Sequence, residues 1–570
     1  MCEIIFRMYN QKKTLHNNKI SDIFILKGEI KMFNYITQNK KLFYLTLLTA
    51  PIAVGFDIGL AWLLRIITDA GTNGEEQLLP RLILISVLYI IFASISDLLY
   101  RKSTVELTNN CIYNVRNDLF NSITDESLIK ISKQNSGYYI SMFLNDLEDL
   151  KMDYFKNMVS SYHEILNFVI SLVLLVKIDI IMAITIIIFS VVQLAVPFIF
   201  EKLIEKRQEE LMNIRNKYTS ILQEFVNNFN LIKFFKREII FQKINQDKSI
   251  EYRNTSNTKE TLSKTIYVLS FASSLAMFLA CMLVGIWLVF KDRITIGQVI
   301  ESSQLMAYVT GPLLNFTDIM TSFKSAKPVQ NKIMNFISEE MPLEVEDEFE
   351  FNNLKLNNIS FKYPTSDKYV LKNLDFTFEK GKKYIIIGES GTGKSTIFKI
   401  LQKQEIATEG EVQLNNKNIL NITDSTYYSK VGFATQDTGI FTASIKDNIS
   451  LFDNRPVDKT IIEQLGLNTL INSKPKGIDT VISSEDKSIS GGEKQRIAIA
   501  RLLNEDFDCI LLDESTSSLD KNSVDIVEEC ILSKKDLTVI AITHHLTSKA
   551  IEMSDCILKL EDGKLVPVTM

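Results

Sequence analysis

Apolar and polar residues are distributed differently in the two halves of the chain. Long apolar runs occupy residues 42–320, whereas short apolar stretches alternate with polar helical segments and glycine-rich turns from about residue 354 onward. A segment needs about 20 apolar residues to cross a bilayer, and a helix can satisfy its own backbone there. Six segments meet this requirement, at residues 43–67, 82–100, 158–176, 180–200, 266–290 and 298–320. The pattern predicts a multidomain membrane protein, in which a six-helix all-α transmembrane domain precedes a soluble α/β domain.

The connections between these segments predict their orientation. Residues 177–179 and 291–295 form short polar turns, so the segments that they join are expected to be hairpins on one side of the bilayer. The long connections 101–157 and 201–265 are polar and have helical periodicity. The second is rich in Lys and Arg, whereas the loop 70–80 contains no basic residue. Because basic connections stay inside, we expect the long connections, both termini and the soluble domain to be cytoplasmic.

Charged residues inside the apolar segments need an explanation. The sixth segment carries Glu301, Asn315 and Asp318, and a polar stripe of this kind can cross only where it faces protein or water. The alternative is a long amphipathic cytoplasmic helix, which would leave an odd number of spans. Asp57 lies in the middle of the first segment. A functional role is the default hypothesis for it, and an ion pair with another helix or a local hydrated kink are the open alternatives.

Length and composition limit the remaining possibilities. With 570 residues, the chain is several times the size of a typical domain. We expect a cytoplasmic lead-in at 1–40, a transmembrane domain with long cytoplasmic extensions at 41–325, a linker at 326–350 and the soluble domain at 351–570.

The formal net charge of −5 gives no basic surface for nucleic acid. The six cysteines lack the spacing of a metal site or a disulfide framework. Abundant Ile, Asn and Lys favour a bacterial source, and hence the cytoplasmic membrane.

The soluble half contains a sequence that predicts a phosphate-binding loop. GESGTGKST at residues 388–396 fits the pattern GxxxxGK[ST] and lies between an apolar strand and a helix. Glycines allow backbone N–H groups to surround phosphates, Lys394 reaches the β- and γ-phosphates, and Ser395 is a ligand for Mg²⁺. The predicted cofactors are therefore ATP and Mg²⁺. The residues of this phosphate loop are Gly388, Glu389, Ser390, Gly391, Thr392, Gly393, Lys394, Ser395 and Thr396. A glycine-rich turn without a ligand is the alternative.

Two further segments belong with the phosphate loop. The strand CILLDE ends in Asp513 and Glu514, at the tip where an α/β sheet normally presents its ligand. Asp513 would hold Mg²⁺ through water, and Glu514 would act as the general base. A second glycine turn, ISGGE at residues 489–493, precedes a predicted helix. One chain with a complete phosphate loop does not need this second turn for its own nucleotide.

The order of these motifs resembles that of an ATP-binding cassette exporter of the half-transporter type, with the type IV fold of bacterial peptide and multidrug exporters. The resemblance extends from the first apolar segment to about Gly563. ISGGE stands where this family has LSGGQ, and the preceding ISSEDKS, at 482–488, stands where the family often has a Gly-Glu pair. Four more residues match family positions: Tyr363 in SFKYP, Gln436 in VGFATQD, Asp520 at the end of STSSLD and His544 in ITHHL.

The resemblance implies roles for these residues. Ser490, Gly491 and Gly492 would close over the γ-phosphate held by a second cassette, so that two chains enclose two nucleotides. Glu514, His544 and Gln436 would be catalytic, and Ser395, Gln436 and Asp513 would hold the metal. Tyr363 would stack on adenine, and Asp520 would lie in the loop between subunits. The alternatives are that Tyr363 covers a sheet edge, that Gln436 is an ordinary loop residue, and that His544 and His545 are solvated.

The resemblance also implies a function. We expect an ATP hydrolase coupled to export of a peptide or an amphipathic drug-like molecule, working as a homodimer in the bilayer. An importer of metal chelates, a lipid or multidrug flippase and a sensor ATPase without transport are the alternatives. The acidic residues Asp57, Glu301 and Asp318 predict a pathway that favours positively charged cargo.

Overall fold

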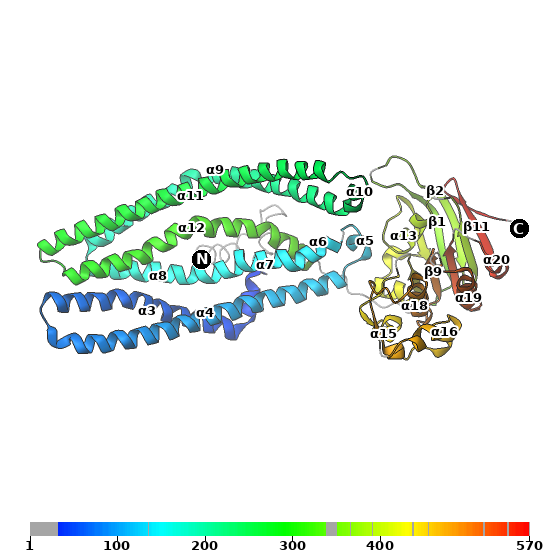
Figure 1. The fold of residues 1–570 in the computed structure, drawn as a ribbon, viewed down its shortest axis with the longest axis horizontal. Helices are drawn as coiled ribbons and strands as arrows, with labels where there is room; N and C mark the ends of the chain where they lie inside the picture. Colours follow the sequence, from blue (N-terminus) through cyan, green and yellow to red (C-terminus); the bar gives the residue numbers. More distant parts are fainter. Residues whose placement is uncertain are drawn as a thin grey trace. The chain divides into compact units, whose positions relative to one another are not determined.

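A computed structural model describes residues 32–337 except 135, and residues 350–568 except 365, 390, 436–437, 454, 517–518 and 544–545. The chain divides into two compact units. The first comprises Met1–Ser122 and Gly137–Glu339, and the second comprises Ile123–Ser136 and Glu340–Met570. Figure 1 shows long helices in the first unit and a mixture of strands and shorter helices in the second. The expected domain boundaries stay predictions, although the expected linker begins as helix, because α12 continues to Ile337.

Each of the six predicted apolar segments lies in a helix of its own. Short elements separate some of the six, and α4, α9, α11 and α12 extend well beyond the predicted spans. The long helices are α3 (Lys40–Thr72), α4 (Leu79–Thr124), α8 (Asn157–Ile178), α9 (Ile180–Asn227), α11 (Glu238–Phe290) and α12 (Ile296–Ile337). The short elements are η1 (Glu76–Leu78), α6 (Ser136–Ser141), η2 (Met142–Asp146), α7 (Leu147–Leu150), η3 (Lys151–Lys156) and α10 (Phe229–Phe234).

The helix α12 differs from the others in composition. Within the described residues, five helices are long and apolar enough to cross a membrane, and α12 is not among them. α12 packs against α3, α8, α9 and α11, and it buries Glu301, Ser302 and Ser303. A helix surrounded in this way can carry polar residues through a bilayer, because they face protein and not lipid. The packing of α12 therefore fits the predicted sixth span better than an isolated amphipathic helix.

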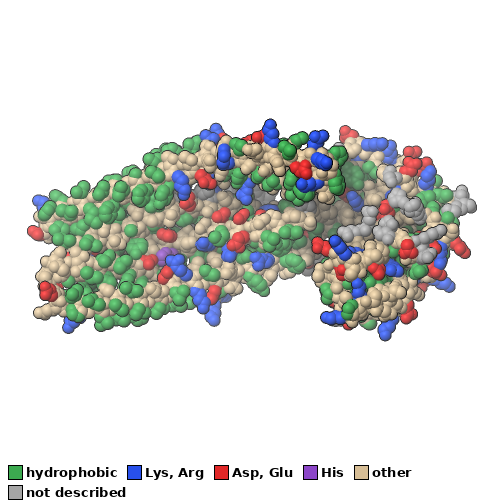
Figure 2. Space-filling model, viewed as in Figure 1, with side chains coloured by type: hydrophobic (Ala, Val, Ile, Leu, Met, Phe, Trp, Pro, Cys, Tyr) green, Lys and Arg blue, Asp and Glu red, His purple; other side chains and the backbone are tan. Residues whose placement is uncertain are grey.

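The longest helices extend far beyond a bilayer. α9 and α11 contain 48 and 53 residues, which at 1.5 Å per residue is about 70–80 Å, whereas the hydrocarbon is about 30 Å thick. They pack along each other, as Figure 1 shows. In Figure 2, apolar side chains cover the ends of the long helices that carry the tight turns, while charged side chains are concentrated farther along. The long connections thus continue the spans as helices, which confirms their predicted helical pattern.

The tight turns meet at one end of the first unit. The α8–α9 turn contributes Asp179, whose carboxylate lies 2.7 Å from the Arg293 guanidinium in the α11–α12 turn. The α11–α12 turn also reaches the end of α3, where Asp69 accepts a hydrogen bond from the Thr295 hydroxyl at 3.0 Å. These contacts place both hairpin turns at the same end of the helices, which confirms the prediction that they lie on the same side of the bilayer.

The second unit contains a parallel sheet and an antiparallel sheet. The six-stranded sheet has the order β12-β11-β3-β10-β9-β6, in which β12 alone is antiparallel to its neighbour. The antiparallel sheet has the order β2-β1-β4-β5, and β7 pairs with β8. The strands are β1 (Asn353–Phe361), β2 (Leu371–Glu379), β3 (Lys383–Ile387), β4 (Glu409–Leu414), β5 (Lys417–Asn418), β6 (Val431–Ala434), β7 (Ala443–Ser444), β8 (Val481–Ile482), β9 (Cys509–Asp513), β10 (Thr538–Ile542), β11 (Cys556–Glu561) and β12 (Lys564–Pro567).

Two large hydrophobic cores and a smaller one around Ile385 stabilise the second unit. One joins the two sheets through large buried side chains, among them Phe378, Phe398 and Tyr427. The other packs isoleucine and leucine from the helices around α18 against β9 and β10. The helices of this unit are α5 (Leu128–Ile131), α13 (Lys394–Leu401), η4 (Ile419–Asn421), α14 (Asp424–Lys430), α15 (Ile445–Ser450), α16 (Lys459–Gln464), α17 (Asn468–Ser473), η5 (Gly477–Asp479), α18 (Gly491–Leu503), α19 (Lys521–Leu532) and α20 (Ser548–Met553).

Candidate functional site

Four adjacent parallel strands bring the predicted catalytic segments to one edge of the sheet. Ile386 of β3 pairs with Ile542 of β10, and Ile542 pairs with Asp513 of β9. The phosphate loop follows β3, Glu514 follows β9, and the segments with Gln436 and His544 follow β6 and β10. Since parallel strands end at the same edge, all four segments start as neighbours there. Gln436, His544 and Ser390 lie outside the described residues, so their predicted roles stay predictions.

Glycines give the phosphate loop its backbone conformation. Gly391 has a φ of +83° and Gly393 a φ of +107°, in the region that residues with a Cβ rarely adopt. A Cβ on Gly393 would also lie 2.8 Å from the Val370 side chain. Gly393 directly precedes α13, so the loop ends at a helix N-terminus where backbone N–H groups favour an anion.

Lys394 is positioned inside this loop. Its side chain is 95% buried, and its ammonium donates hydrogen bonds to the carbonyl oxygens of Gly388 at 2.6 Å and Glu389 at 2.9 Å. These carbonyl oxygens compensate the positive charge of the Lys394 ammonium within the loop itself. A phosphate approaching the loop would offer Lys394 stronger acceptors at the same place. The glycine conformations and the buried Lys394 therefore fit the phosphates of ATP.

The acidic pair has an unusual backbone. Glu514 has a φ of +49° and donates its backbone N–H to Ile542 at 3.1 Å. The left-handed conformation costs about 1–2 kcal/mol for a residue with a Cβ. It interrupts the extended backbone directly after Asp513, the last residue of β9. Strain of this kind is common at functional sites.

Tyr363 and Asp520 have structural partners. The Tyr363 hydroxyl lies 3.2 Å from the Thr396 hydroxyl of α13, and its ring packs edge-on against Phe361. The tyrosine is thus next to the phosphate loop, where either stacking on a base or covering the sheet edge is sterically reasonable. Asp520 caps α19 by accepting hydrogen bonds from Ser523. These hydrogen bonds lower the pKa of the Asp520 carboxyl.

The second glycine turn forms the N-terminus of α18. Ser490 is the N-cap, and its hydroxyl accepts from the Glu493 backbone N–H at 3.3 Å. In return, the Glu493 carboxylate accepts from the Ser490 backbone at 2.8 Å. This capping box explains why glutamate is tolerated where the resemblance expects glutamine, since either side chain has an acceptor oxygen. Ser490 and Gly491 are exposed at this helix end and Gly492 is half-buried.

Sequence reasoning missed a connection between α18 and the segment after Gln436. The half-buried Arg501 donates hydrogen bonds to the carbonyl oxygens of Asn448, Gly439 and Thr438 at 2.8, 3.1 and 3.3 Å. Burial lowers the pKa of Arg501. The available signal was an arginine in the otherwise apolar end of IAIARLL, where a basic side chain needs acceptors.

Asp57 contacts a neighbouring helix in the first unit. Its carboxylate lies 3.3 Å from His163 Nε2 and 3.4 Å from Asn167 Nδ2, both on α8. The Tyr308 hydroxyl of α12 donates to the Asp57 backbone carbonyl at 2.8 Å. Of the alternatives left open by the sequence, the interhelical pair is the one that these contacts support.

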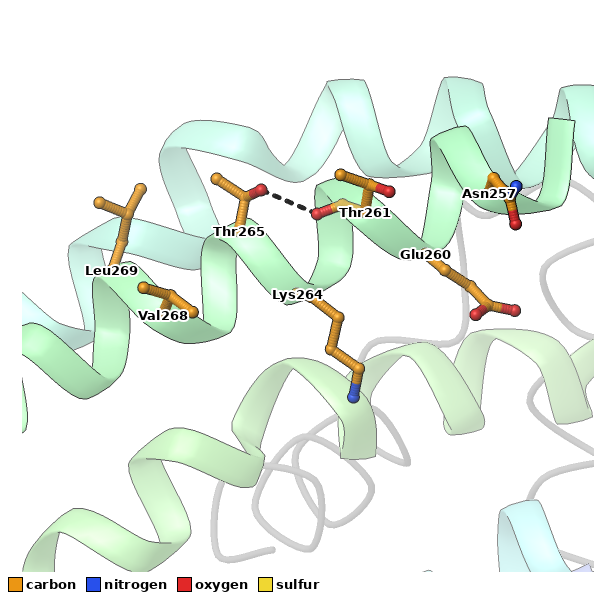
Figure 3. A pocket seen from close by; sticks show the side chains of 7 residues that line it. All are labelled: Asn257, Glu260, Thr261, Lys264, Thr265, Val268 and Leu269. Carbon is orange, nitrogen blue, oxygen red and sulfur yellow. Dashed lines mark hydrogen bonds between the residues drawn. The ribbon is translucent and has the colours of Figure 1, made fainter. Parts of the chain in front are cut away.

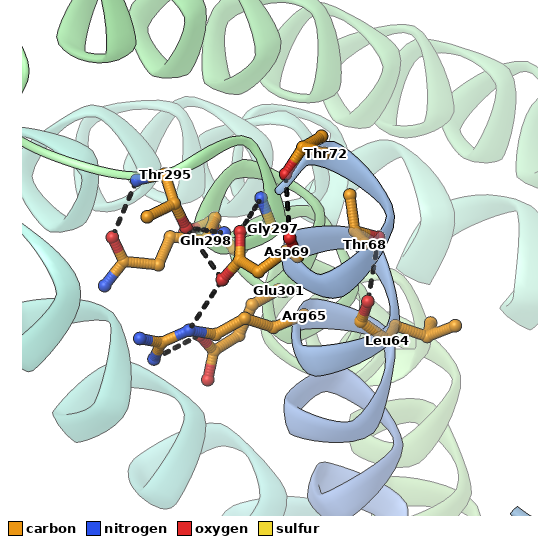
Figure 4. A network of polar contacts seen from close by, with 10 residues as sticks. Leu64, Arg65, Thr68, Asp69, Thr72, Thr295, Gly297, Gln298 and Glu301 are labelled. Atoms are coloured by element: carbon orange, nitrogen blue, oxygen red, sulfur yellow. Dashed lines mark hydrogen bonds and ion pairs between the residues drawn. The ribbon is translucent and has the colours of Figure 1, made fainter. Parts of the chain in front are cut away.

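Glu301 takes part in a different polar cluster, which joins the end of α3 to the start of α12 (Figure 4). Its carboxylate lies 3.3 Å from Arg65, and Arg65 also lies 3.6 Å from Asp69. The Gly297 backbone N–H donates to Asp69 at 3.0 Å. A Cβ on Gly297 would lie 2.5 Å from the Arg65 carbonyl oxygen, so glycine permits this close approach. We call this cluster the α3–α12 clasp. The pairing compensates the charge of Glu301, which contrasts with the exposed Asp318.

An open hollow of about 470 Å³ runs along one helix of the first unit. Its lining residues all belong to α11, and Figure 3 shows Glu260 and Lys264 extending from that helix on the same side. They are Asn257, Glu260, Thr261, Lys264, Thr265, Val268 and Leu269. The mixture of polar, charged and apolar groups has no fixed chemical preference.

Two family models match the chain. The model described as ABC transporter transmembrane region matches residues 42–313, and the model described as ABC transporter matches residues 371–517. The first match covers the helices from α3 into α12. The second begins at β2 and ends shortly after Glu514, so it includes the phosphate loop, the second glycine turn and the acidic pair.

Individual proteins are similar over long stretches. A Staphylococcus aureus (strain NCTC 8325 / PS 47) protein named for multidrug export, with an ATP-binding/permease role, is 23% identical over 562 residues, 94% of this chain and 95% of that protein. The lactococcin-A transport/processing ATP-binding protein of Lactococcus lactis is 30% identical over 401 residues, 66% of this chain and 54% of that protein. A solved bacterial Atm1-family ABC exporter with ATP bound has a TM-score of 0.77 at 18% identity, over 92% of this chain and 94% of that one. This last likeness shows a shared fold.

Proposed function

Because this chain belongs to the ABC transporter family, as an ATP-hydrolysing transporter whose transmembrane region and ATPase domain lie in one polypeptide, we propose that it exports a peptide or an amphipathic drug-like molecule. The observation that carries this proposal is the shared edge of four parallel strands, where the phosphate loop after β3 and Glu514 after β9 end on either side of β10. Relatives named for multidrug export and for lactococcin-A transport support the direction and the cargo class. The membrane is proposed to be the bacterial cytoplasmic membrane.

The phosphate loop and its neighbours would bind ATP. Lys394 would leave the carbonyl oxygens of Gly388 and Glu389 and donate to the phosphates, while the backbone N–H groups of residues 391–396 surround them. Tyr363 would stack on the adenine. Ser395, Asp513 and Gln436 would hold Mg²⁺, which supplies charge neutralisation at the β- and γ-phosphates.

Glu514 would act as the general base of hydrolysis. Its carboxylate would accept a proton from the water that attacks the γ-phosphorus, and His544 would help to hold that phosphate. The strained backbone of Glu514 supports this role, because it fixes where the side chain leaves the strand. Gln436 would transmit a change in the ATP site to the transmembrane helices. The segment that follows it, whose carbonyl oxygens bind Arg501, would carry this change.

A second copy of the chain would complete the transporter. The Ser490 turn would close over the nucleotide of the partner, and Asp520 would lie near the junction. Large apolar side chains are exposed around α10 in the single chain, which supports a protein partner at this place. They are Phe229, Leu231, Phe234, Phe235 and Ile239, with exposed fractions of 45, 55, 80, 66 and 81%.

Transport direction provides the test. Inside-out vesicles from a bacterium that expresses the chain should accumulate a labelled amphipathic peptide or a drug-like dye when ATP is added outside. Vesicles with Lys394→Ala should not, because the phosphate loop would lose its cation. ATP-driven accumulation of iron chelates in the opposite direction would identify the importer alternative. A functional ATPase that moves neither probe nor a fluorescent lipid would contradict the proposed export.

A further inference from the structure

The connection between β10 and α20 contains His544, the residue proposed to help hold the γ-phosphate. It comprises the residues from Thr543 to Thr547. Its first end is fixed to the sheet, because the Thr543 backbone N–H donates to the Ile386 carbonyl oxygen of β3 at 3.3 Å. Its last end is fixed to α20, because Thr547 is the N-cap and its hydroxyl accepts from the Ala550 backbone N–H at 2.9 Å. A connection this short can move little unless one of its ends moves.

Thr547 also contacts a second helix. Its hydroxyl donates a hydrogen bond to the carboxylate of Glu528 on α19, and α19 and α20 pack against each other. A hydroxyl has one proton, so a threonine that accepts from Ala550 and donates to Glu528 has a fixed orientation. This pair therefore joins α19 to the last residue of the connection that contains His544.

The environment of Glu528 is unfavourable for a charge. The residue is half-buried, and burial raises the pKa of its carboxyl, whereas the hydrogen bond from Thr547 lowers it. The nearby Asp525 raises this pKa further, and Lys549 on α20 lowers it. An apolar side chain would pack between the two helices without losing the hydration of a carboxylate. Ionisable groups that are perturbed in this way are concentrated at functional sites.

The helix α19 leads from this pair to the predicted junction between two chains. Asp520 is the N-cap of α19, where it accepts hydrogen bonds from Ser523. Glu528 follows Asp520 by eight residues, which is about 12 Å along a helix. A partner chain that displaced Asp520 would displace Glu528 as well, because one continuous helix joins them.

From these contacts we propose that Glu528 is a positioning residue for ATP hydrolysis. By accepting the hydrogen bond from Thr547, its carboxylate holds the connection that contains His544 against α19 and sets where the histidine meets the γ-phosphate. This inference rests on the proposed function, in which His544 helps to hold that phosphate and Asp520 lies near the junction between chains. It adds a link within one chain from that junction to the histidine.

The neighbouring Glu529 provides a matched control. Its carboxylate pairs with Lys549 of α20, so it also joins α19 to α20. The two side chains are 60% and 33% exposed, and exposed pairs of this kind contribute little to stability. Glu529→Leu removes a link between the same helices without removing a partner of Thr547. It should leave ATP turnover at the wild-type level.

ATP turnover of the purified full-length chain in lipid nanodiscs tests the proposal. Glu528→Leu keeps a good helix former but leaves the Thr547 hydroxyl without its acceptor. We expect kcat to fall by at least about fivefold, because a small displacement of a catalytic group has a large effect on rate. KM for ATP should change by less than about twofold, because the phosphate loop is intact. The unfolding midpoint should not fall, because the substitution removes a half-buried charge.

Further variants separate positioning from folding. Glu528→Gln keeps an acceptor oxygen and Thr547→Ser keeps the hydroxyl, so each should retain at least about half of the wild-type kcat. Thr547→Val loses both the donor and the helix cap, so it should lower kcat and the unfolding midpoint together. In a double variant, Glu528→Leu should not slow His544→Ala further, because both changes act through the same group.

The possible outcomes decide the proposal. Wild-type kcat in Glu528→Leu overturns it, as does an equal loss of kcat in Glu529→Leu. A lower unfolding midpoint in Glu528→Leu, with a loss of turnover that adds to that of His544→Ala, would show a structural contact alone and would also overturn it. If His544→Ala hydrolyses ATP at the wild-type rate, the proposed role of the histidine is refuted and this inference with it. If His544→Ala is slow but Glu528→Leu is not, this inference alone is refuted.

Discussion

At the scale of single residues, backbone conformation and burial decide which side chains can carry chemistry. The sequence predicts an acidic pair after a strand because CILLDE ends in Asp513 and Glu514. It does not predict the left-handed conformation of Glu514, whose backbone N–H donates to Ile542 of a neighbouring strand that is distant in sequence. Likewise, Asp57 was recognisable as a charge in an apolar segment. Its contact with Asn167 was not, because the two residues are 110 positions apart.

A substitution at Glu514 tests the proposed general base. Glu514→Gln keeps the size and hydrogen-bonding shape of the side chain but cannot accept the proton from water. ATP turnover should fall by at least about a hundredfold, the scale of a lost general base, while ATP binding is retained. Phosphate release and nucleotide binding of the purified chain would be measured in parallel. Glu529→Gln, which alters an exposed residue paired with Lys549, serves as the control and should be nearly neutral. Near-normal phosphate release from Glu514→Gln would remove this residue from the role.

At the scale of elements, the hydrophobic pattern predicts that a helix is present better than it predicts what that helix packs against. The six apolar segments were predictable because each lies in one continuous helix. The polarity of α12 was not self-explanatory, since it depends on packing against α11 and against three helices that are distant in sequence, α3, α8 and α9. In the soluble half, the motifs predicted the loops at the strand ends. For the connection of α18 to the loop after Gln436, Arg501 in IAIARLL indicates a need for acceptors, but the acceptors themselves could not be predicted, because they are backbone carbonyls.

The α3–α12 clasp should depend on the small size of Gly297. Gly297→Ala would place a Cβ 2.5 Å from the Arg65 carbonyl oxygen, so the two helices would have to move apart. Overpacking of this kind typically costs about 1–3 kcal/mol. Thermal unfolding of the purified chain, followed by intrinsic fluorescence, should show a lower midpoint. Gly71→Ala is the matched control near the same end of α3, because a Cβ there meets no atom within 4 Å. Equal midpoints for both variants would show that the close approach is not rigid.

Arg501 should stabilise the second unit and support catalysis through the same contacts. Arg501→Met keeps much of the apolar stem but leaves the carbonyl oxygens of Asn448, Thr438 and Gly439 without this donor. We expect a loss of at least about 2 kcal/mol in stability, given the cost of unsatisfied acceptors. ATP turnover should fall about tenfold or more if the segment positions Gln436. The control is Arg455→Met, which removes a surface ion pair with Glu505. If Arg501→Met lowers the unfolding midpoint but leaves turnover at the control level, the contact is structural alone.

At the scale of the whole molecule, the proposed site is incomplete in one chain. Lys394 is buried in the phosphate loop, whereas Ser490 is exposed at the start of α18 and its side chain bonds to Glu493. This arrangement is consistent with the prediction that the two residues lie on opposite sides of a shared nucleotide, one from each chain. Sequence motifs predicted this need for a partner. They do not determine whether the partner is identical, and the intact set of Lys394, Asp513 and Glu514 favours a homodimer.

Complementation between two inactive chains tests the homodimer directly. In a Glu514→Gln background, a Lys394→Ala chain cannot hold phosphate, and a Ser490→Arg chain cannot close over a partner's nucleotide. Loss of the Ser490 cap costs only about 1 kcal/mol, so the second variant should still fold. Neither chain alone should trap labelled ATP. Co-expressed with different affinity tags and purified through both, they should trap up to one ATP per mixed dimer. That site combines the phosphate loop of the Ser490→Arg chain with the Ser490 turn of the Lys394→Ala chain. Mixed dimers that trap no ATP would contradict the shared arrangement, and a wild-type chain that purifies as an inactive monomer would point to a different partner.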